Sequence, residues 1–165
     1  TLSRVEAIQN AATATVYGVQ AGLEVKLASR FRLFSDINYQ IGEEETDNGT
    51  KSPLRHAPPT YGVSKLSYTS QNLSVQLYAI YSGKRKFEDL PLEEQTKPEI
   101  YAIDKNGKPW SPGWYTLNFK SMYRINENFS VSAGLENITD QRYRPYSSGI
   151  VAPGRNVVMS LKASF

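Results

Sequence analysis

Cysteine is absent from this sequence of 165 residues, and histidine occurs once. Without thiols the chain has no disulfide framework and no cysteine nucleophile, and a single imidazole cannot form a His-based metal cluster. The net charge of +3 is small and scattered, unlike the basic surface of a nucleic-acid-binding protein. We therefore expect no catalytic residues, no resident metal, no cofactor and no nucleic-acid partner, and we do not expect an enzyme.

Long apolar runs are absent too. Hydrophobic residues make up 39% of the chain, and no stretch approaches the ~20 consecutive apolar residues of a membrane helix. A search for long apolar runs does not detect membrane β-barrels, because only alternate residues of their strands face lipid. The 11 tyrosines suit the aromatic belts of such a barrel better than a dry core, where each hydroxyl needs a partner.

Apolar and polar residues alternate through most of the chain. Residues 157–165 show this best, since Val157, Met159 and Leu161 alternate with Ser160 and Lys162. Successive strand side chains point to opposite faces, so the period of two predicts strands with one apolar face. For residues 61–68 the pattern does not show which face is apolar. The seven expected strands are 15–27, 31–41, 61–68, 73–82, 115–124, 129–135 and 157–165.

The connections between these strands alternate between short and long. Short turns fall near residues 28–30, 69–72 and 125–128, and long loops at 43–59, 83–112 and after 138. Several of the expected strands run to the ~10 residues of a tilted membrane strand, whereas strands of soluble proteins average ~5–6. Short turns at one end and long loops at the other are typical of outer-membrane barrels.

The C-terminal segment carries a further pattern. Residues 135–143, Leu-Glu-Asn-Ile-Thr-Asp-Gln-Arg-Tyr, precede Pro-Gly-Arg at 153–155 and a closing strand that ends on an aromatic residue. In order and spacing this resembles the C-terminus of TonB-dependent outer-membrane receptors. Residues 17–24 and 53–59 also resemble segments of that family, although Gln20 stands where Glu is usual. The residues of this end motif, which we expect to be structural, are Asn137, Asp140, Tyr143, Pro153, Gly154, Arg155 and Phe165.

The resemblance implies an all-β, antiparallel transmembrane barrel of about 22 strands with a plugged lumen. Residues 1–165 would be its C-terminal portion, with the plug domain and the upstream strands outside this chain. It also implies a receptor in the bacterial outer membrane that imports a scarce nutrient, powered by TonB. A ferric siderophore or haem is the first expectation, and cobalamin and glycans remain open. The expected partners are outer-membrane lipid and lipopolysaccharide, the N-terminal part of the same receptor, TonB through that part, and a small ligand such as an iron chelate.

Two further features fit a portion of a larger barrel. No signal-peptide pattern opens the sequence, and we interpret residues 1–12 as the end of an external loop. Seven strands is an odd number, whereas bacterial single-chain barrels have even numbers and must close. We therefore expect residues 1–165 to be a fragment of a nicked receptor or part of a longer chain.

Cationic and aromatic residues gather in the expected external loops, where recognition is usually found. Such groups suit an anionic, aromatic ligand, although external cations also bind lipopolysaccharide. Tyr143 adds a further aromatic ring in the same region, but it belongs to the end motif. The candidate ligand-binding residues are Arg85, Lys86, Trp110, Arg142, Arg144 and Tyr146.

Charged residues of the strands should point into the lumen, because charge on the lipid side is costly. They would form a wetted inner wall or contact the plug: Glu24, Lys26, Lys120, Arg124, Glu136 and Lys162. Two loop features carry alternatives. The acidic run 43–47 is a calcium site or, more simply, a solvated loop, and His56 is a loop residue or a ligand contact.

Two other classes of protein compete with the receptor. A passive porin-like or adhesin-type barrel would share the strands but lack a plug and the segment that TonB grips. A secreted soluble β-protein, possibly an enzyme, would instead bury Tyr115, Leu161 and Phe165 in a core.

Overall fold

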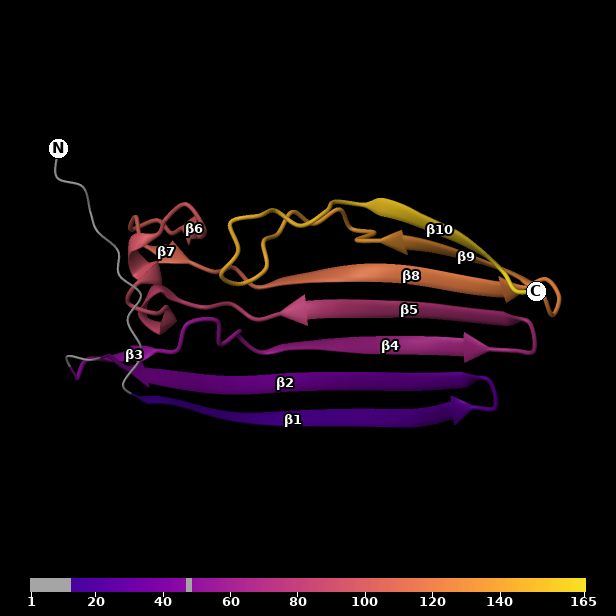
Figure 1. Ribbon diagram of the computed structural model, residues 1–165, viewed down its shortest axis with the longest axis horizontal. Coiled ribbons are helices and arrows are strands. Elements are labelled where there is room, and N and C mark those ends of the chain that lie inside the picture. The colour runs from indigo at the N-terminus through magenta and orange to yellow at the C-terminus, as the bar shows by residue number, and fades with distance from the viewer. Residues whose placement is uncertain (1–12, 47–48) are drawn as a thin grey trace.

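A single long antiparallel sheet dominates the computed structural model, which describes residues 13–46 and 49–165 (Figure 1). Seven long strands lie side by side in chain order, β1-β2-β4-β5-β8-β9-β10, and the short β3 pairs with β2. The prediction of an all-β antiparallel fold is confirmed. The long strands are β1 (Thr13–Ala28), β2 (Phe31–Glu45), β4 (Tyr61–Thr69), β5 (Leu73–Ser82), β8 (Trp114–Arg124), β9 (Phe129–Glu136) and β10 (Asn156–Ala163).

The remaining elements are short and lie in the loops. They are β3 (Lys51–Pro53), two 3-10 helices, η1 (Phe87–Asp89) and η2 (Glu94–Thr96), and the small hairpin of β6 (Ala102–Ile103) and β7 (Pro109–Trp110). Among the described residues no helix has the length and apolar character needed to cross a membrane. The loop end expected at residues 1–12 lies outside the described residues.

The register of the strands places one continuous apolar face on the sheet. This apolar face consists of the odd-numbered residues of 15–27, 31–41, 73–81, 115–123, 129–135 and 157–163 and the even-numbered residues of 62–68. None of its side chains is charged, whereas every charged residue of these strand segments lies on the opposite, polar face. The six charges expected on the lumen side, from Glu24 to Lys162, all share that polar face.

Pairing also assigns the faces of β4, which the sequence alone left open. Leu66 lies opposite Leu33 of β2 and Leu77 of β5, so it joins the apolar face. Lys65 lies opposite Phe34 and Tyr78 on the polar face, where its Nζ stands 5.1 Å from the centroid of the Phe34 ring.

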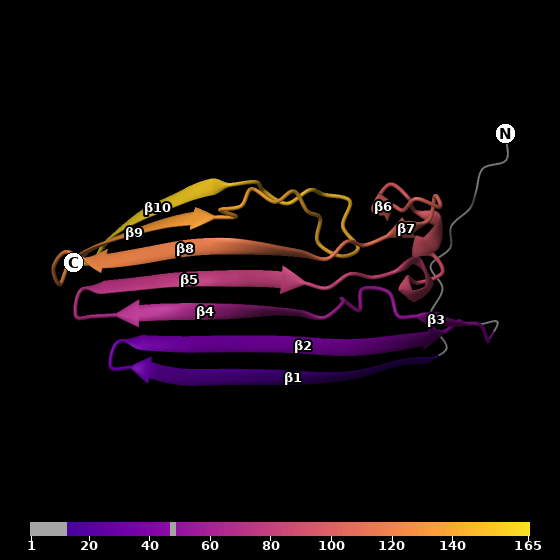
Figure 2. The same cartoon turned by 180° about the vertical axis from the view of Figure 1, so that it is seen from behind.

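Short turns gather at one end of the sheet and long loops at the other, as the loop lengths predicted (Figures 1 and 2). One loop is more ordered than expected. β2 continues through the acidic residues 43–45 and pairs with β3, and Lys51 Nζ lies 2.8 Å from Glu43 Oε1. Gly49, just before β3, has a φ of 77°, a left-handed backbone conformation that glycine adopts readily.

The core of the described structure lies in the loops and not between sheets. The three largest fully buried side chains, Leu90, Pro91 and Glu94, all belong to the loop between β5 and β8. The large apolar side chains of the sheet are instead exposed, among them Val19, at 69%, and Leu161, at 70%. A sheet that exposes its apolar face needs an apolar environment on that side.

Candidate ligand site in the long loops

Residues 49–60, 83–113 and 137–155, here called the loop cluster, are joined by hydrogen bonds between the loops. The backbone N–H of Leu92 donates to Ser52 Oγ at 3.1 Å, which links the first loop to the second. Arg144 Nη1 donates to the carbonyl of Glu99 at 3.0 Å, which links the third loop to the second. The cluster is therefore a packed structure at one end of the sheet, and not three independent loops.

Asn137 fixes the point where the third loop leaves β9. Its side chain is buried, its Nδ2 donates to the carbonyls of Gln141, at 2.9 Å, and Pro153, at 3.2 Å, and its Oδ1 accepts from Gln141 N at 2.9 Å. Its own N–H donates to Asn118 Oδ1 of β8 at 2.9 Å. Because Asn tolerates the left-handed backbone, here with a φ of 49°, one residue both turns the chain and ties the two ends of the loop.

Asp140 and Arg155 close the same loop from the other side. Asp140 Oδ1 accepts from the backbone N–H of Arg155 at 2.8 Å, and Arg155 Nε donates to the carbonyl of Ile138 at 3.0 Å. A Cβ on Gly154 would lie 2.8 Å from Asp140 Oδ1, closer than side chains tolerate. These contacts explain three residues of the end motif: Asp140 and Arg155 hold the two ends of the loop together, and Gly154 leaves room for the Asp140 carboxylate.

Two aromatic residues extend the loop across the polar face. Tyr143 stacks on Trp114, with ring centroids 4.0 Å apart and planes inclined by 28°. Trp114 begins β8 opposite Ser82, on the polar face of the sheet.

At the far end of the sheet, the terminal ring of Phe165 lies edge-on to Phe129, with centroids 6.0 Å apart.

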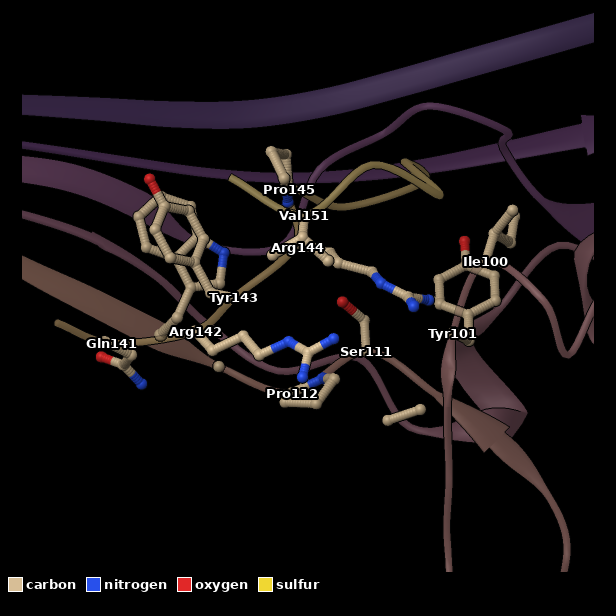
Figure 3. A pocket seen from close by; sticks show the side chains of 13 residues that line it. Ile100, Tyr101, Ser111, Pro112, Gln141, Arg142, Tyr143, Arg144, Pro145 and Val151 are labelled. Atoms are coloured by element: carbon tan, nitrogen blue, oxygen red, sulfur yellow. The ribbon is translucent and has the colours of Figure 1, made fainter. Parts of the chain in front are cut away.

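A cavity of about 320 Å³ lies between the second and third loops (Figure 3). Arg142 and Arg144 extend from the third loop toward the side of Tyr101 and Ser111, and the stacked pair of Trp114 and Tyr143 adds aromatic surface. The cavity contains no carboxylate among its lining residues, which are Ile100, Tyr101, Ala102, Ser111, Pro112, Gly113, Trp114, Gln141, Arg142, Tyr143, Arg144, Pro145 and Val151.

The structure brings two of the six candidate ligand residues, Arg142 and Arg144, into this cavity and places the others elsewhere. Arg85 and Tyr146 line a second cavity of about 420 Å³, together with Glu43 and Asp89. Arg85 Nη2 donates to the carbonyls of Ala57 and Pro58, at 3.4 and 3.3 Å, so its guanidinium holds the first loop. Trp110 pairs with Ala102 in the small hairpin, and Lys86 is exposed just before η1.

Sequence reasoning missed three residues: Trp114, which lines the cavity from the start of β8, and Tyr101 and Glu94 of the loop cluster. Trp114 stands between the long loop and the strand expected at 115–124, and neither Tyr101 nor Glu94 stands in a pattern that predicts burial. Burial, and then the hydrogen bond to Glu94, raises the pKa of the Tyr101 phenol. Burial also raises the pKa of Tyr146, and the charge of Glu94 adds to that shift. Both phenols therefore stay protonated and can donate.

No metal centre emerges from the described residues, which contain no group of three or more acidic, His or Cys side chains that could hold an ion. In the acidic run, Glu43 is paired with Lys51, and Asp47 lies outside the described residues. His56 is exposed and has a φ of 63°, which is a turn conformation.

Comparison with known proteins identifies the family. Residues 4–138 match the family model described as TonB dependent receptor-like, beta-barrel. The chain is similar to the copper transporter OprC (TM-score 0.71, 17% identity, 92% of this chain and 24% of that one). It is also similar to a mutant of the ferric enterobactin receptor PfeA from Pseudomonas aeruginosa, in complex with enterobactin (TM-score 0.71, 22% identity, 92% of this chain and 23% of that one). The siderophore receptor PirA from Acinetobacter baumannii is similar too (TM-score 0.66, 22% identity, 92% of this chain and 22% of that one). No curated protein sequence matches the chain.

The chain belongs to the TonB-dependent receptor family and contains part of its β-barrel. The prediction of this family, and of the bacterial outer membrane as the location, is confirmed. In a membrane barrel the apolar face meets lipid and the polar face lines the lumen. Family members are receptors and transporters and not enzymes. The chain spans 24% or less of the length of each of these three solved structures.

Proposed function

We propose that the protein imports a small anionic, aromatic ligand across the outer membrane, with a ferric siderophore as the first candidate and haem as the second. The observation that carries the proposal is the cavity of the loop cluster. Two guanidinium groups and a stacked indole and phenol line it, and no carboxylate does. The protein acts as a receptor and transporter, and not as an enzyme.

The chemistry of the cavity favours an anionic chelate over a neutral sugar. Guanidinium groups bind carboxylate and phenolate oxygens through short, charge-assisted hydrogen bonds. The rings of Trp114 and Tyr143 offer flat surface for an aromatic ligand group. Two of the similar structures are described as a ferric enterobactin receptor and a siderophore receptor, which supports an iron chelate.

The proposed transport is driven by TonB, which would act through a part of the receptor outside this chain. Residues 1–165 would form the C-terminal portion of a barrel of about 22 strands whose lumen is filled by a plug. The small share of each similar structure that the chain covers supports this view. The charged polar face would then contact the plug, and lipid and lipopolysaccharide would surround the sheet.

Uptake by whole cells tests this proposal. The complete receptor is expressed in cells that lack their own ferric siderophore receptors, with or without a working TonB, and radioactive ferric enterobactin is supplied. We expect accumulation only where TonB works. Equal accumulation without TonB would instead identify a passive, porin-like barrel. If neither strain accumulates iron although the receptor is present at normal levels, ferric enterobactin is not a ligand of this receptor.

A further inference from the structure

Glu94 is a fully buried carboxylate in the loop cluster, with 0% of its surface exposed. It lies at the start of η2, directly after the buried turn of Leu90 and Pro91, and its N–H donates to the carbonyl of Pro91 at 2.8 Å. Burying a charge is costly unless hydrogen bonds compensate for the lost water. The carboxylate therefore has to be explained by its partners.

Those partners come from all three loops. Ser147 Oγ of the third loop donates to Oε1 at 2.5 Å, and the Tyr101 hydroxyl of the second loop donates to Oε2. Arg55 of the first loop places its Nε 3.5 Å from Oε1. One side chain thus joins the three loops, and each of its oxygens has at least one donor.

Two of these partners stand beside the ligand cavity. Tyr101 lines it directly, and Ser147 follows three residues after Arg144, which also lines it. Ser147 has a φ of 56°, an unfavourable backbone for a residue with a Cβ, so its bond to Glu94 helps to hold a strained turn. The ring of Tyr101 also lies near that of Tyr146, with centroids 6.2 Å apart.

We propose that Glu94 is a positioning residue of the ligand cavity, which it does not line. Through Tyr101 and Ser147 it sets the spacing between the second and third loops, and so between Tyr101 and the two arginines of the third loop. This inference rests on the proposed function for its ligand, but the spacing itself can be measured without one. Glu94 can affect ligand binding in two opposite ways. Its negative charge alone would weaken the binding of an anion, whereas its hydrogen bonds to the two loops would strengthen binding by fixing the shape of the cavity.

Glu94→Gln in the complete receptor separates the two effects. Gln has nearly the same shape, but it has one carbonyl acceptor in place of two carboxylate oxygens and cannot accept from both Tyr101 and Ser147 as Glu does. We expect the Kd for ferric enterobactin to rise about tenfold, the loss typical of one hydrogen bond to a charged group. Ser147→Ala should act in the same direction, and Thr139→Ala, which removes an exposed hydroxyl of the same loop, is the control.

Spin labels report the spacing directly in the absence of ligand. Cysteines introduced at Ile103 and Ile150, which are 50% and 79% exposed, carry the labels on the second and third loops, and any other cysteine of the complete receptor is first replaced by serine. We expect one narrow distance distribution in the wild type and in Thr139→Ala, and a broad or shifted one in Glu94→Gln and Ser147→Ala.

Each result decides the matter. Unchanged distances in Glu94→Gln would overturn the inference, and so would changed distances with an unchanged or lower Kd. If wild-type receptor does not bind ferric enterobactin, the distances alone decide. A broader distance distribution in Glu94→Gln would then support the role of Glu94, and only the proposal that the ligand is ferric enterobactin would be wrong.

Discussion

Ser35 and Ser64 face each other across the β2–β4 pair on the apolar face, with their hydroxyl oxygens 2.8 Å apart. The apolar face has one other serine, Ser121, whose hydroxyl donates to the carbonyl of Ala133 at 3.4 Å. A hydroxyl in hydrocarbon has no water to bind, so it must find its partner within the protein. The three serines of the face can therefore lie against lipid without an unpaired hydroxyl.

The serine pair should show coupling when it is removed. Ser35→Ala or Ser64→Ala alone should lower the free energy of unfolding by up to about 1 kcal/mol, because the remaining hydroxyl loses its partner. The double variant should cost less than the sum of the two, since no hydroxyl is then left unpaired. A double-mutant cycle measured by unfolding in lipid vesicles checks this, and strict additivity would show that the pair contributes nothing.

Arginine substitutions test the assignment of the two faces. Leu161→Arg should cost roughly 2–4 kcal/mol if it lies near the bilayer midplane, because it places a charge in lipid. Its sequence neighbour Ser160 lies on the polar face opposite Ser132, so Ser160→Arg should be milder. The pair Leu135→Arg and Ser132→Arg should behave in the same way on β9. Equal losses on the two faces, measured by unfolding in lipid, would show that the faces are wrongly assigned.

Gly62 marks a close approach within the sheet. A Cβ at this position would lie 2.3 Å from the carbonyl oxygen of Asp36 and 2.6 Å from the hydroxyl of Tyr81. Gly62→Ala should therefore destabilise the protein by about 1–3 kcal/mol, as overpacking does. Gly22→Ala is the control, because its Cβ would lie 3.5 Å from its nearest neighbour, in ordinary contact. A similar free energy of unfolding for both variants would contradict the tight contact.

The loop cluster should loosen at high pH. The pKa of Tyr101 is raised above its ordinary value of 10.0, mainly by burial and then by its bond to Glu94. A raised pKa in the folded state adds stability that is complete below about pH 10 and is lost as the pH rises toward the folded value. We expect the loop spacing, measured by the same spin labels, to broaden above pH 10, and to depend less on pH in Tyr101→Phe. The same pH dependence in both proteins would contradict a role for this phenol.

The long strands could be predicted from the sequence because nearly all of them repeat a period of two over seven residues or more. The face of β4 could not, since Lys65 and Gly62 dilute its pattern, and only the pairing with Leu33 and Leu77 places Leu66. In the loops, composition predicted cations and aromatics near a ligand. It could not separate Arg142 and Arg144, which share a cavity, from Lys86, which does not line it.

Glu94 shows the limit of such reasoning most clearly. In the sequence it stands beside Glu93, and the pair reads as part of a solvated, charged loop. In the structure Glu93 is exposed and Glu94 is fully buried, because donors from three loops meet at Glu94 alone. Contacts between loops far apart in the chain have no period that a sequence pattern could reveal.

The ligand cavity is tested most directly by the affinity of the complete receptor for ferric enterobactin after paired loss of charge. Arg142→Ala with Arg144→Ala removes the two guanidinium groups of the cavity. Lys86→Ala with Lys105→Ala removes the same charge from exposed positions of the loop cluster. We predict that Kd, measured by fluorescence quenching, rises about 100-fold or more for the arginine pair, as the loss of two charged hydrogen bonds implies, and hardly changes for the lysine pair. Equal weakening by both pairs, or no change with the arginine pair, would contradict binding in this cavity.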